Sequence, residues 1–340
     1  MSQTCRQLKR ISIVAIALVG AIVLIGGSHG EALAESGGAS PETVTICQGG
    51  APGIPLLLTQ EKGLFAAEGV AVTLKKYRTG TEGFEEFFKG ECDLAAISET
   101  SAVLKSFERQ DFSILATTAT SDNSGRILAS RKSGITTPQD LKGKRIFVLK
   151  GSSNHFFLDM FLAKNGLSNK NVTVILTPVP DVSAAFADGS IDAFCATEVV
   201  IDKPMKALGK EAVVFDSPGL CLVSFHLVAK NSLVTTRPDM VKKVLAALLK
   251  NEESIKKDRA SAVKAAAAAL NIEEQVMGDI WDNYRWQVDL SQALLLSLEQ
   301  EARWAIDSGL TNKSRIPNYL DFIHRDALFS LRSEAVTMLK

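Results

Sequence analysis

The 340-residue chain is poor in aromatic residues and has no excess of charge of either sign. Phe, Trp and Tyr make up 6% of the residues, and 38 Lys and Arg balance 38 Asp and Glu. Proteins that grip nucleic acid or lie on anionic lipid carry a basic face, so this balance excludes nucleic acid as the expected partner. The low aromatic content also argues against a stacked aromatic cage around a ligand. A small molecule or another protein is the expected partner.

Cysteine and histidine are scarce as well, with five and four residues. Cys5 lies in the N-terminal segment, and the spacing of Cys47, Cys92, Cys195 and Cys221 matches neither a zinc knuckle nor a CxxC redox pair. Two interpretations stay open. Either all four are buried thiols, or Cys195 and Cys221, which share the central segment, form a disulfide. No metal site and no cofactor is expected.

Motifs of the common enzyme classes are missing from residues 35–340. This part of the chain has no Gly-x-Ser-x-Gly elbow, no His-Glu-x-x-His, no P-loop and no GxGxxG after a strand. We therefore expect a binding protein with no catalytic residue.

The N-terminus has the composition of an export signal. Arg6, Lys9 and Arg10 precede an apolar stretch at 11–27, and Ala34 closes a small-residue cleavage site. These features predict a signal peptide at 1–34 and a periplasmic or extracytoplasmic location. An uncleaved membrane anchor is the alternative. No lipobox cysteine follows the apolar stretch, so no lipid anchor is expected.

Strand-like stretches alternate with helical patterns along the rest of the chain, which indicates βαβ units and therefore an α/β protein with mainly parallel sheets. The predicted strands, rich in β-branched residues, are 44–47, 70–77, 93–97, 113–117, 145–149, 172–176 and 191–195. The most clearly bounded helices are 82–89, 154–164 and 182–187.

Two further strand-like segments, 127–131 and 222–230, do not fit this alternation of strands and helices. We interpret them as the crossings between two lobes. Lobe one would comprise 35–131 and 222–340, and lobe two 132–221. The helical tail at 238–306 is expected to pack on lobe one and to brace the hinge.

Several motifs agree in order and spacing with one known family. They are Ala51-Pro52, Glu61-Lys62-Gly63-Leu64-Phe65, Glu68-Gly69-Val70, Phe88-Lys89-Gly90-Glu91-Cys92-Asp93-Leu94-Ala95, Gly134-Ile135, Asp140-Leu141-Lys142-Gly143-Lys144-Arg145-Ile146, Gly151-Ser152-Ser153-Asn154-His155 and Asp188-Gly189-Ser190-Ile191-Asp192-Ala193. Over most of the chain the sequence resembles the solute-binding proteins of the nitrate, sulfonate, taurine and thiamine-precursor class of ABC importers.

This resemblance implies a two-lobed periplasmic-binding-protein fold of type II that closes about a hinge on a solute and delivers it to the permease subunits of an importer. A monomer is expected. The sequence departs from the family where Glu198 is followed by Val199 instead of Pro, which implies a differently shaped loop. Two alternatives stay open: a receptor that presents its closed form to a sensor kinase, and a thiamine-precursor or menaquinone-type enzyme on the same fold.

In open α/β sheets, ligands bind outside the carboxyl ends of the strands. The loops at those ends supply the candidate ligand-binding residues. In lobe one these are Gly50, Ala51, Pro52, Thr79, Gly80, Thr81, Ser98, Glu99, Thr100, Ser121 and Asn123. In lobe two they are Gly151, Ser152, Ser153, Asn154, His155 and Glu198.

The turn at 151–154 runs from a predicted strand directly into a helix, so its backbone N–H groups and the helix dipole suit an anion such as a sulfonate, carboxylate or nitrate. The alternative is that Ser153 or Asn154 only caps the helix. His155 has a donor role or a packing role as alternatives, and Arg78 is the nearest obvious cation. A small, anionic solute is therefore the predicted ligand, and its identity is beyond the sequence.

Overall fold

Two five-stranded mixed sheets organise the computed structural model, which describes residues 42–176 and 181–338. The predicted signal peptide at 1–34 lies outside these residues. Within the described ranges, none of the helices has the length and apolar character needed to cross a membrane. Each of the seven predicted strands has a counterpart in one of the two sheets.

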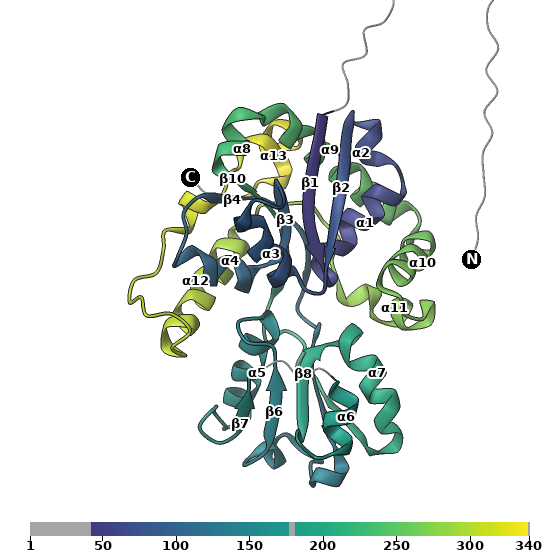
Figure 1. Ribbon diagram of the computed structural model, residues 1–340, viewed down its shortest axis with the longest axis vertical. Helices are drawn as coiled ribbons and strands as arrows, with labels where there is room; N and C mark the ends of the chain where they lie inside the picture. Colours follow the sequence, from purple (N-terminus) through teal and green to yellow (C-terminus); the bar gives the residue numbers. More distant parts are fainter. Residues whose placement is uncertain (1–41, 177–180, 339–340) are drawn as a thin grey trace, which may run out of the picture. The chain divides into compact units, whose positions relative to one another are not determined.

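The first sheet has the strand order β2-β1-β3-β10-β4 (Figure 1). Strand β1 pairs in parallel with β2 and β3, whereas β10 runs antiparallel to β3 and β4. The strands are β1 (Glu42–Gly49), β2 (Val70–Tyr77), β3 (Leu94–Ser98), β4 (Phe112–Ser121) and β10 (Val223–Lys230). Because β10 runs the other way, its first residues lie beside the carboxyl end of β3.

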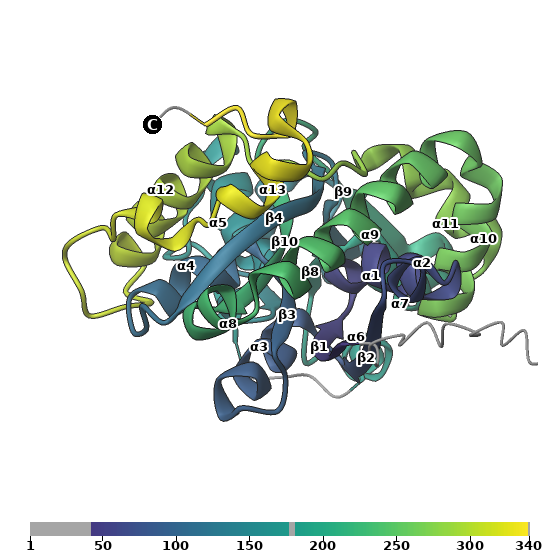
Figure 2. The same ribbon diagram turned by 90° about the horizontal axis from the view of Figure 1, so that it is seen from above.

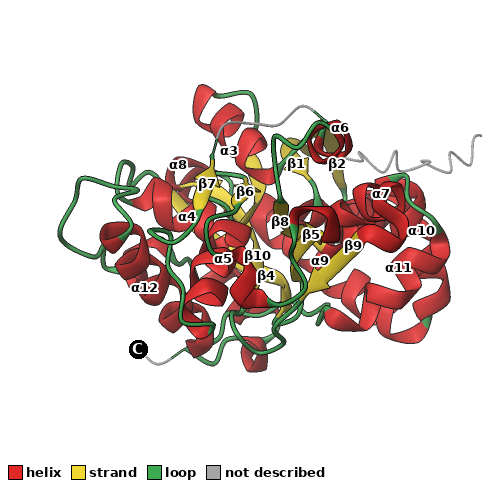
Figure 3. Cartoon of the chain, turned by 90° about the horizontal axis from the view of Figure 1, so that it is seen from below, coloured by secondary structure: helices red, strands yellow, loops and turns green. Residues whose placement is uncertain are grey.

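The second sheet has the order β7-β6-β8-β5-β9 (Figure 3). Its strands are β5 (Gly125–Ser130), β6 (Arg145–Val148), β7 (Thr173–Ile175), β8 (Ala193–Thr197) and β9 (Ala212–Phe215). Strand β5 pairs antiparallel with both β8 and β9. By strand pairing, the chain therefore enters the second sheet at Gly125, earlier than residue 132, and returns to the first sheet with β10.

Alternating side chains give the second sheet two buried faces, because successive residues of a strand point to opposite sides. Ile146 and Val148 belong to the apolar cluster that contains the side chains of α5, whereas Phe147 between them belongs to the cluster formed with α6 and α7. The sheet is thus covered by α5 on one face and by α6 and α7 on the other, as Figure 3 shows.

Eight helices accompany the strands up to β10 and the turn after it. They are α1 (Ile54–Glu61), α2 (Leu64–Ala67), α3 (Gly80–Lys89), α4 (Glu99–Ser106), α5 (Ser153–Lys164), α6 (Val182–Ala187), α7 (Glu198–Leu208) and α8 (Asn231–Thr236). Helices α3, α4, α5 and α7 each begin within a few residues of the carboxyl end of a strand. This is the connection that a parallel sheet requires.

The described C-terminal segment adds the helices α9 to α13 (Figure 2). They are α9 (Pro238–Lys257), α10 (Arg259–Leu270), α11 (Glu274–Ile280), α12 (Gln292–Asp307) and α13 (Asp326–Leu331). Helix α9 packs on α1 and α2 beside the first sheet, α12 packs on α4, and α11 contacts α7 of the second sheet. The predicted packing of the tail on the first lobe is confirmed, and α11 carries the tail across to the second.

The disulfide joins Cys47 and Cys92, whose Cα atoms are 5.7 Å apart. The expectation of a Cys195–Cys221 bond is wrong, since both are buried free thiols. The alternative of four free thiols is wrong as well. Cys47 lies on β1 opposite Ala95 of β3, and Cys92 lies just before β3. Adjacent parallel strands thus bring together two cysteines that are 45 residues apart.

Candidate functional site

Helix N-termini gather at the carboxyl edges of both sheets. Helices α3 and α4 start there in the first lobe, and α5 and α7 start there in the second. The first N–H groups of a helix have no carbonyl of a preceding turn to bind, and the helix dipole is positive at this end. The edge of each sheet therefore offers donors and positive potential, which suits a negatively charged group.

The turn before α5 presents backbone N–H groups that can donate hydrogen bonds. Gly151 has a φ of 66°, a conformation that favours glycine, and a Cβ at this position would lie 2.6 Å from Leu104 of α4. Ser152 caps the helix by accepting a hydrogen bond from the N–H of His155 (3.3 Å). Capping by Ser152 leaves the N–H groups of Ser153 and Asn154 at the head of the helix.

His155 does not extend towards a ligand in this structure. Its Nδ1 accepts a hydrogen bond from the N–H of Gly151 at 3.3 Å, and its ring packs edge-on against Trp304 with centroids 5.3 Å apart. Burial lowers the pKa of the imidazole. Its described contacts fit the packing role.

Thr100, at the start of α4, connects the two lobes. Its Oγ1 lies 3.4 Å from the Oγ of Ser153 and donates a 2.5 Å hydrogen bond to Oε2 of Glu301 on α12. The carboxylate of the neighbouring Glu99 accepts a 2.7 Å hydrogen bond from the N–H of Ser224. The start of α5 thus faces the start of α4 across the junction.

Glu99 and Glu301 form a fully buried acidic pair, each with 0% of its surface exposed. Burial raises the pKa of Glu99 to about 7, although hydrogen bonds from Ser224 and Ser153 act in the opposite direction. Burial and the neighbouring charge of Glu99 raise the pKa of Glu301 as well. At least one of the two is therefore protonated near neutral pH, and the junction carries less negative charge than its sequence indicates.

The other polar residues of the first lobe have short-range partners. Thr79 caps α3 by accepting a hydrogen bond from the N–H of Glu82 (3.1 Å). Ser101 of α4 links the first turn of α3 to the end of β3, because its Oγ lies 3.0 Å from the hydroxyl oxygen of Thr81 and 3.3 Å from that of Ser98. Gly80 is buried in the first turn of α3.

The loop after β1 approaches a buried glutamine. A Cβ at Gly53 would lie 2.0 Å from Oε1 of Gln48, so only glycine fits here without displacing that side chain. Gly50 has a φ of 61°, which favours glycine, and the 3₁₀ turn Ala51–Gly53 places Pro52 near its start. Oε1 of Gln48 is buried and has no partner among the described residues.

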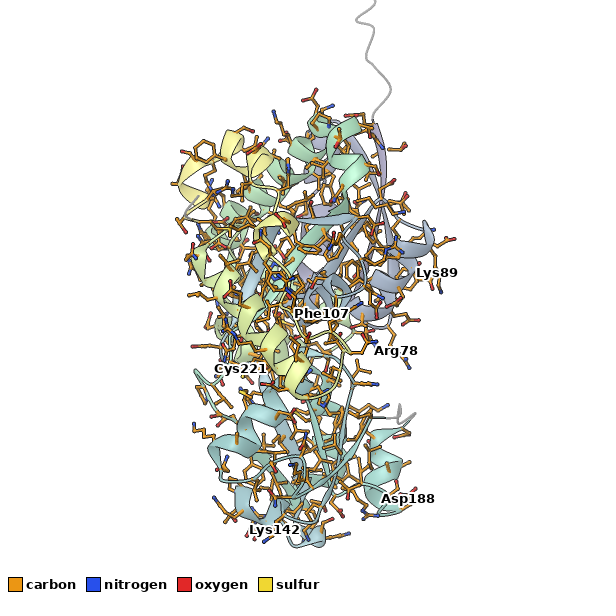
Figure 4. All side chains as sticks on the ribbon, turned by 90° about the vertical axis from the view of Figure 1, so that its left-hand side faces the viewer. Arg78, Lys89, Phe107, Lys142, Asp188 and Cys221 are labelled. Carbon is orange, nitrogen blue, oxygen red and sulfur yellow. A yellow bond between two sulfur atoms is a disulfide. The ribbon has the colours of Figure 1, made fainter. Side chains whose placement is uncertain are left out.

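Ser121 and Asn123 lie where β4 crosses to the second sheet. Ser121 Oγ accepts a hydrogen bond from the N–H of Asn123 at 3.2 Å. Asn123 donates to Asn283 at 3.0 Å, and its backbone carbonyl accepts a 2.7 Å hydrogen bond from Arg126. Arg126 therefore brings a guanidinium to this crossing, whereas Arg78 is exposed (Figure 4).

Glu198 starts α7, next to the turn of α5. Its backbone N–H donates to the carbonyl of Ser124 at 3.2 Å, and 7% of the residue is exposed. Asn283 and Tyr284 are near enough to its carboxyl group to act on the Glu198 pKa as hydrogen-bond donors, although neither makes a well-aligned hydrogen bond with it. Burial raises the pKa of Glu198 to about 7, although nearby Arg126 lowers it.

A cavity of about 450 Å³ opens beside the junction. Its walls include Thr81 and Ser101 from the first lobe and Lys150 and Gly151 from the second. Lys150 and Lys313 lie in its lining together with Lys105, which forms ion pairs with the lining residues Glu85 and Glu108. The cavity thus joins predicted site loops from both lobes with cations that the sequence analysis did not select.

Several residues at the junction were missed because they come from the C-terminal tail or from β10. Trp304 of α12 donates a 2.8 Å hydrogen bond from Nε1 to the carboxylate of Asp159 on α5, which adds another hydrogen bond between the lobes. Ser224 Oγ lies 2.9 Å from Nε2 of His226, whose pKa burial lowers to about 3. Glu301 has no sequence motif around it. Nothing local in the sequence marks these residues as neighbours of α4 and α5.

Comparison with solved structures identifies the class as the periplasmic-binding-protein fold. The chain superposes on the alkanesulfonate-binding protein SsuA from Xanthomonas axonopodis pv. citri bound to MOPS with a TM-score of 0.73 and 23% identity, covering 84% of this chain and 99% of that chain. The periplasmic aliphatic sulphonate binding protein SsuA from Escherichia coli gives a TM-score of 0.69 and 18% identity, covering 84% of this chain and 93% of that chain.

The family model described as NMT1/THI5 like matches residues 53–262, and the chain belongs to this family. A Bacillus subtilis (strain 168) protein, provisionally named as an aliphatic sulfonates-binding protein, is 28% identical over 196 residues, which are 56% of this chain and 59% of that protein. The match therefore spans little more than half of the Bacillus protein. The desulfurization enzyme DSZB has the same fold at 16% identity and a TM-score of 0.62, covering 86% of this chain and 99% of that chain.

Proposed function

We propose that this chain is an extracytoplasmic solute-binding protein that holds a small anionic solute, with a sulfonate as the first candidate, between its two lobes and hands it to an ABC importer. The observation that carries the proposal is the turn before α5, whose leading N–H groups face Thr100 of the opposite lobe, with Ser153 Oγ 3.4 Å from Thr100 Oγ1. The names of the relatives support a sulfonate as the first choice.

The solute's anionic group would accept hydrogen bonds from the N–H groups of Ser153 and Asn154, where the start of α5 faces Thr100 of the opposite lobe. Neutral donors can hold an oxyanion while remaining able to release it, since no fixed positive charge has to be separated from it. Because at least one of Glu99 and Glu301 is protonated near neutral pH, this place carries less negative charge than two ionised carboxylates would bring. Contacts from both lobes would favour a closed form, which the importer's permease subunits would recognise.

The lobes of this proposal are the first sheet with α1–α4 and α8–α13, and the second sheet with α5–α7. Export by cleavage after Ala34 belongs to the same proposal, and N-terminal sequencing of the exported protein tests it. A monomer is expected in light scattering, with or without solute.

Calorimetric and thermal-shift titration with ethanesulfonate tests the binding role. Saturation at 100 times Kd should add about 2.7 kcal/mol to the free energy of unfolding. Ser153→Asp places a negative charge where the anion would lie and should abolish the shift, because a carboxylate at the start of a helix is compatible with folding. Ser168→Ala, an exposed site in the same lobe, is the matched control and should keep it.

Retained binding in Ser153→Asp would refute the site, and no binding of sulfonates, nitrate or carboxylates would refute the function. The fold shared with a desulfurization enzyme gives turnover a direct assay. Incubation with aryl sulfinates and alkanesulfonates should release no sulfite if the protein only binds.

A further inference from the structure

Two fully buried carboxyl groups, those of Glu99 and Glu301, lie beside the turn that is proposed to hold the anion. Glu99 starts α4, and Glu301 lies on α12, which packs beside α4 (Figure 1). Each residue has 0% of its surface exposed. Glu301 lies beyond the region matched by the family model, 53–262. We call these two residues the acidic pair.

The acidic pair is held by neutral groups. Thr100 donates a 2.5 Å hydrogen bond to Glu301, and the backbone N–H of Ser224 donates a 2.7 Å hydrogen bond to Glu99. Among the residues that the structure describes, no Lys or Arg forms an ion pair with either carboxyl group. Two ionised carboxylates in such a buried place repel each other strongly, so the pair keeps at least one proton.

The other titratable side chains around the acidic pair are neutral near pH 7. They are His226 on β10, Cys221 before β10, Tyr319 of the 3₁₀ turn Tyr319–Phe322 and His155 on α5. Burial lowers the pKa of His226 to about 3 and that of His155 below its ordinary value, and it raises the pKa of Cys221 to about 12 and that of Tyr319 further. The charged residues of these surroundings are Asp159 on α5, Glu299 on α12 and the exposed Lys150 before α5. The acidic pair is therefore the group that can change its charge near neutral pH.

Hydroxyl groups connect the acidic pair to the start of α5. Thr100 Oγ1 lies 2.5 Å from Oε2 of Glu301, 3.5 Å from Oε1 of Glu99 and 3.4 Å from Oγ of Ser153. The N–H of Ser153 is one of the proposed donors to the anion, so the anion would lie only a few hydrogen bonds from both carboxyl groups. Charges in buried surroundings interact more strongly than they do in water. An anion at the start of α5 and a negative charge on the acidic pair would therefore oppose each other.

We infer that the protein takes up a proton together with its solute, and that the acidic pair binds this proton as the anionic group binds at the start of α5. This inference rests on the proposed function and concerns the regulation of the same site. The pair holds one proton before the solute binds and takes the second from solvent when it binds. By linkage, the anion and the proton strengthen each other's binding by the same factor. The affinity for the solute therefore rises as the surroundings become more acidic.

The pKa of Glu99, about 7, sets the pH range of this linkage. Near pH 5 the acidic pair is already fully protonated without solute, so binding takes up no proton. A neighbouring negative charge strengthens the binding of a proton by about a hundredfold. Binding should then take up about 0.5 proton for each solute at pH 7 and about 0.8 at pH 8. The slope of log Kd against pH equals this number of protons, so Kd should rise about fivefold from pH 7 to pH 8.

Titration of the unbuffered protein with sodium ethanesulfonate in a pH-stat counts the protons directly, because ethanesulfonate does not titrate between pH 5 and pH 8. The acid needed to hold the pH should be about 0.5 equivalent for each bound solute at pH 7, about 0.8 at pH 8 and less than about 0.1 at pH 5. Gln at both positions of the acidic pair can still accept the hydrogen bonds from Thr100 and Ser224, but it cannot bind a proton. The double variant Glu99→Gln with Glu301→Gln should take up less than about 0.1 equivalent at each pH and should bind at pH 8 at least as tightly as the wild type. Glu108→Gln, an exposed carboxylate just beyond α4, is the control and should match the wild type.

The outcomes separate the inference from the proposed function. If ethanesulfonate binds without proton uptake at pH 7 and pH 8, the inference is overturned while the proposed function stands. Proton uptake that survives in the double variant overturns it too, because another group then receives the proton. If ethanesulfonate does not bind at pH 5, 7 or 8, the sulfonate form of the proposed function fails, and the inference fails with it. Melting curves without solute establish that each variant is folded. If the double variant does not fold, Glu99→Gln alone replaces it and should lose most of the uptake.

Discussion

Replacing Glu99 by Gln should remove a large part of the pH dependence of stability. Glu99 is fully buried, and its pKa is raised from 4.5 to about 7 mainly by burial. A carboxyl group with a raised pKa binds its proton more tightly in the folded state than in the unfolded state. Its contribution is therefore complete below pH 4.5 and is lost as the pH rises through 7.

The magnitude follows from the two pKa values. Between pH 5 and pH 8 the folded protein must give up the Glu99 proton at a pKa of about 7, whereas the unfolded chain gives it up at 4.5. This difference lowers the free energy of unfolding by about 2 to 3 kcal/mol. Gln has the same shape and can still accept the hydrogen bond from Ser224, but it does not titrate. Glu99→Gln should thus be more stable than the wild type at pH 8 and similar to it at pH 5.

Urea unfolding at pH 5, 6, 7 and 8 measures the effect. The wild-type curve should fall across this range, and the Glu99→Gln curve should fall by about 2 to 3 kcal/mol less. Glu334→Gln, an exposed carboxylate, should follow the wild type. Parallel curves for wild type and Glu99→Gln would show that this carboxyl group is ionised at no cost, and the account of the buried acidic pair would be refuted.

Three other perturbations have defined outcomes. The affinity for ethanesulfonate, measured by calorimetry, should fall about fivefold from pH 7 to pH 8, because ionised Glu99 repels an anion at the start of α5. Glu99→Gln should remove most of this pH dependence. An affinity that rises with pH would contradict the anion site. Trp304→Phe removes the hydrogen bond to Asp159 and should lower the free energy of unfolding, measured in urea, by about 1.5 to 3 kcal/mol. An unchanged free energy of unfolding would show that this hydrogen bond does not stabilise the junction between the lobes. Cys47→Ala with Cys92→Ala opens a loop of 45 residues and should cost about 4 kcal/mol, measured against the oxidised protein; equal stability would refute the bond.

The fold was readable because its elements are encoded locally. The consecutive apolar residues Ile146, Phe147 and Val148 are typical of a strand that is buried on both faces. Glycines such as Gly90 end helices at positions where the left-handed conformation is needed. Strand and helix then alternate at the spacing of βαβ units, which leaves few topologies. The loops predicted for the site follow from the same rule, and their role in binding a solute stays a prediction.

Pairings between distant residues were beyond the sequence. Four cysteines allow several connectivities, and only the adjacency of β1 and β3 selects Cys47 with Cys92. Likewise, no local pattern indicates that Tyr284 meets Glu198 or that Glu301 meets Thr100.

The sequence by itself determined nine of the ten described strands, their alternation with helices, the presence of two lobes and the family, whereas β9 (Ala212–Phe215) was not predicted. Tertiary structure alone decided which cysteines bond, that β5 belongs to the second sheet, and which carboxyl groups are buried. The reason is physical. Periodicity and turn residues act over a few neighbouring positions, whereas burial and the pKa of a carboxyl group depend on atoms that only the folded chain brings together.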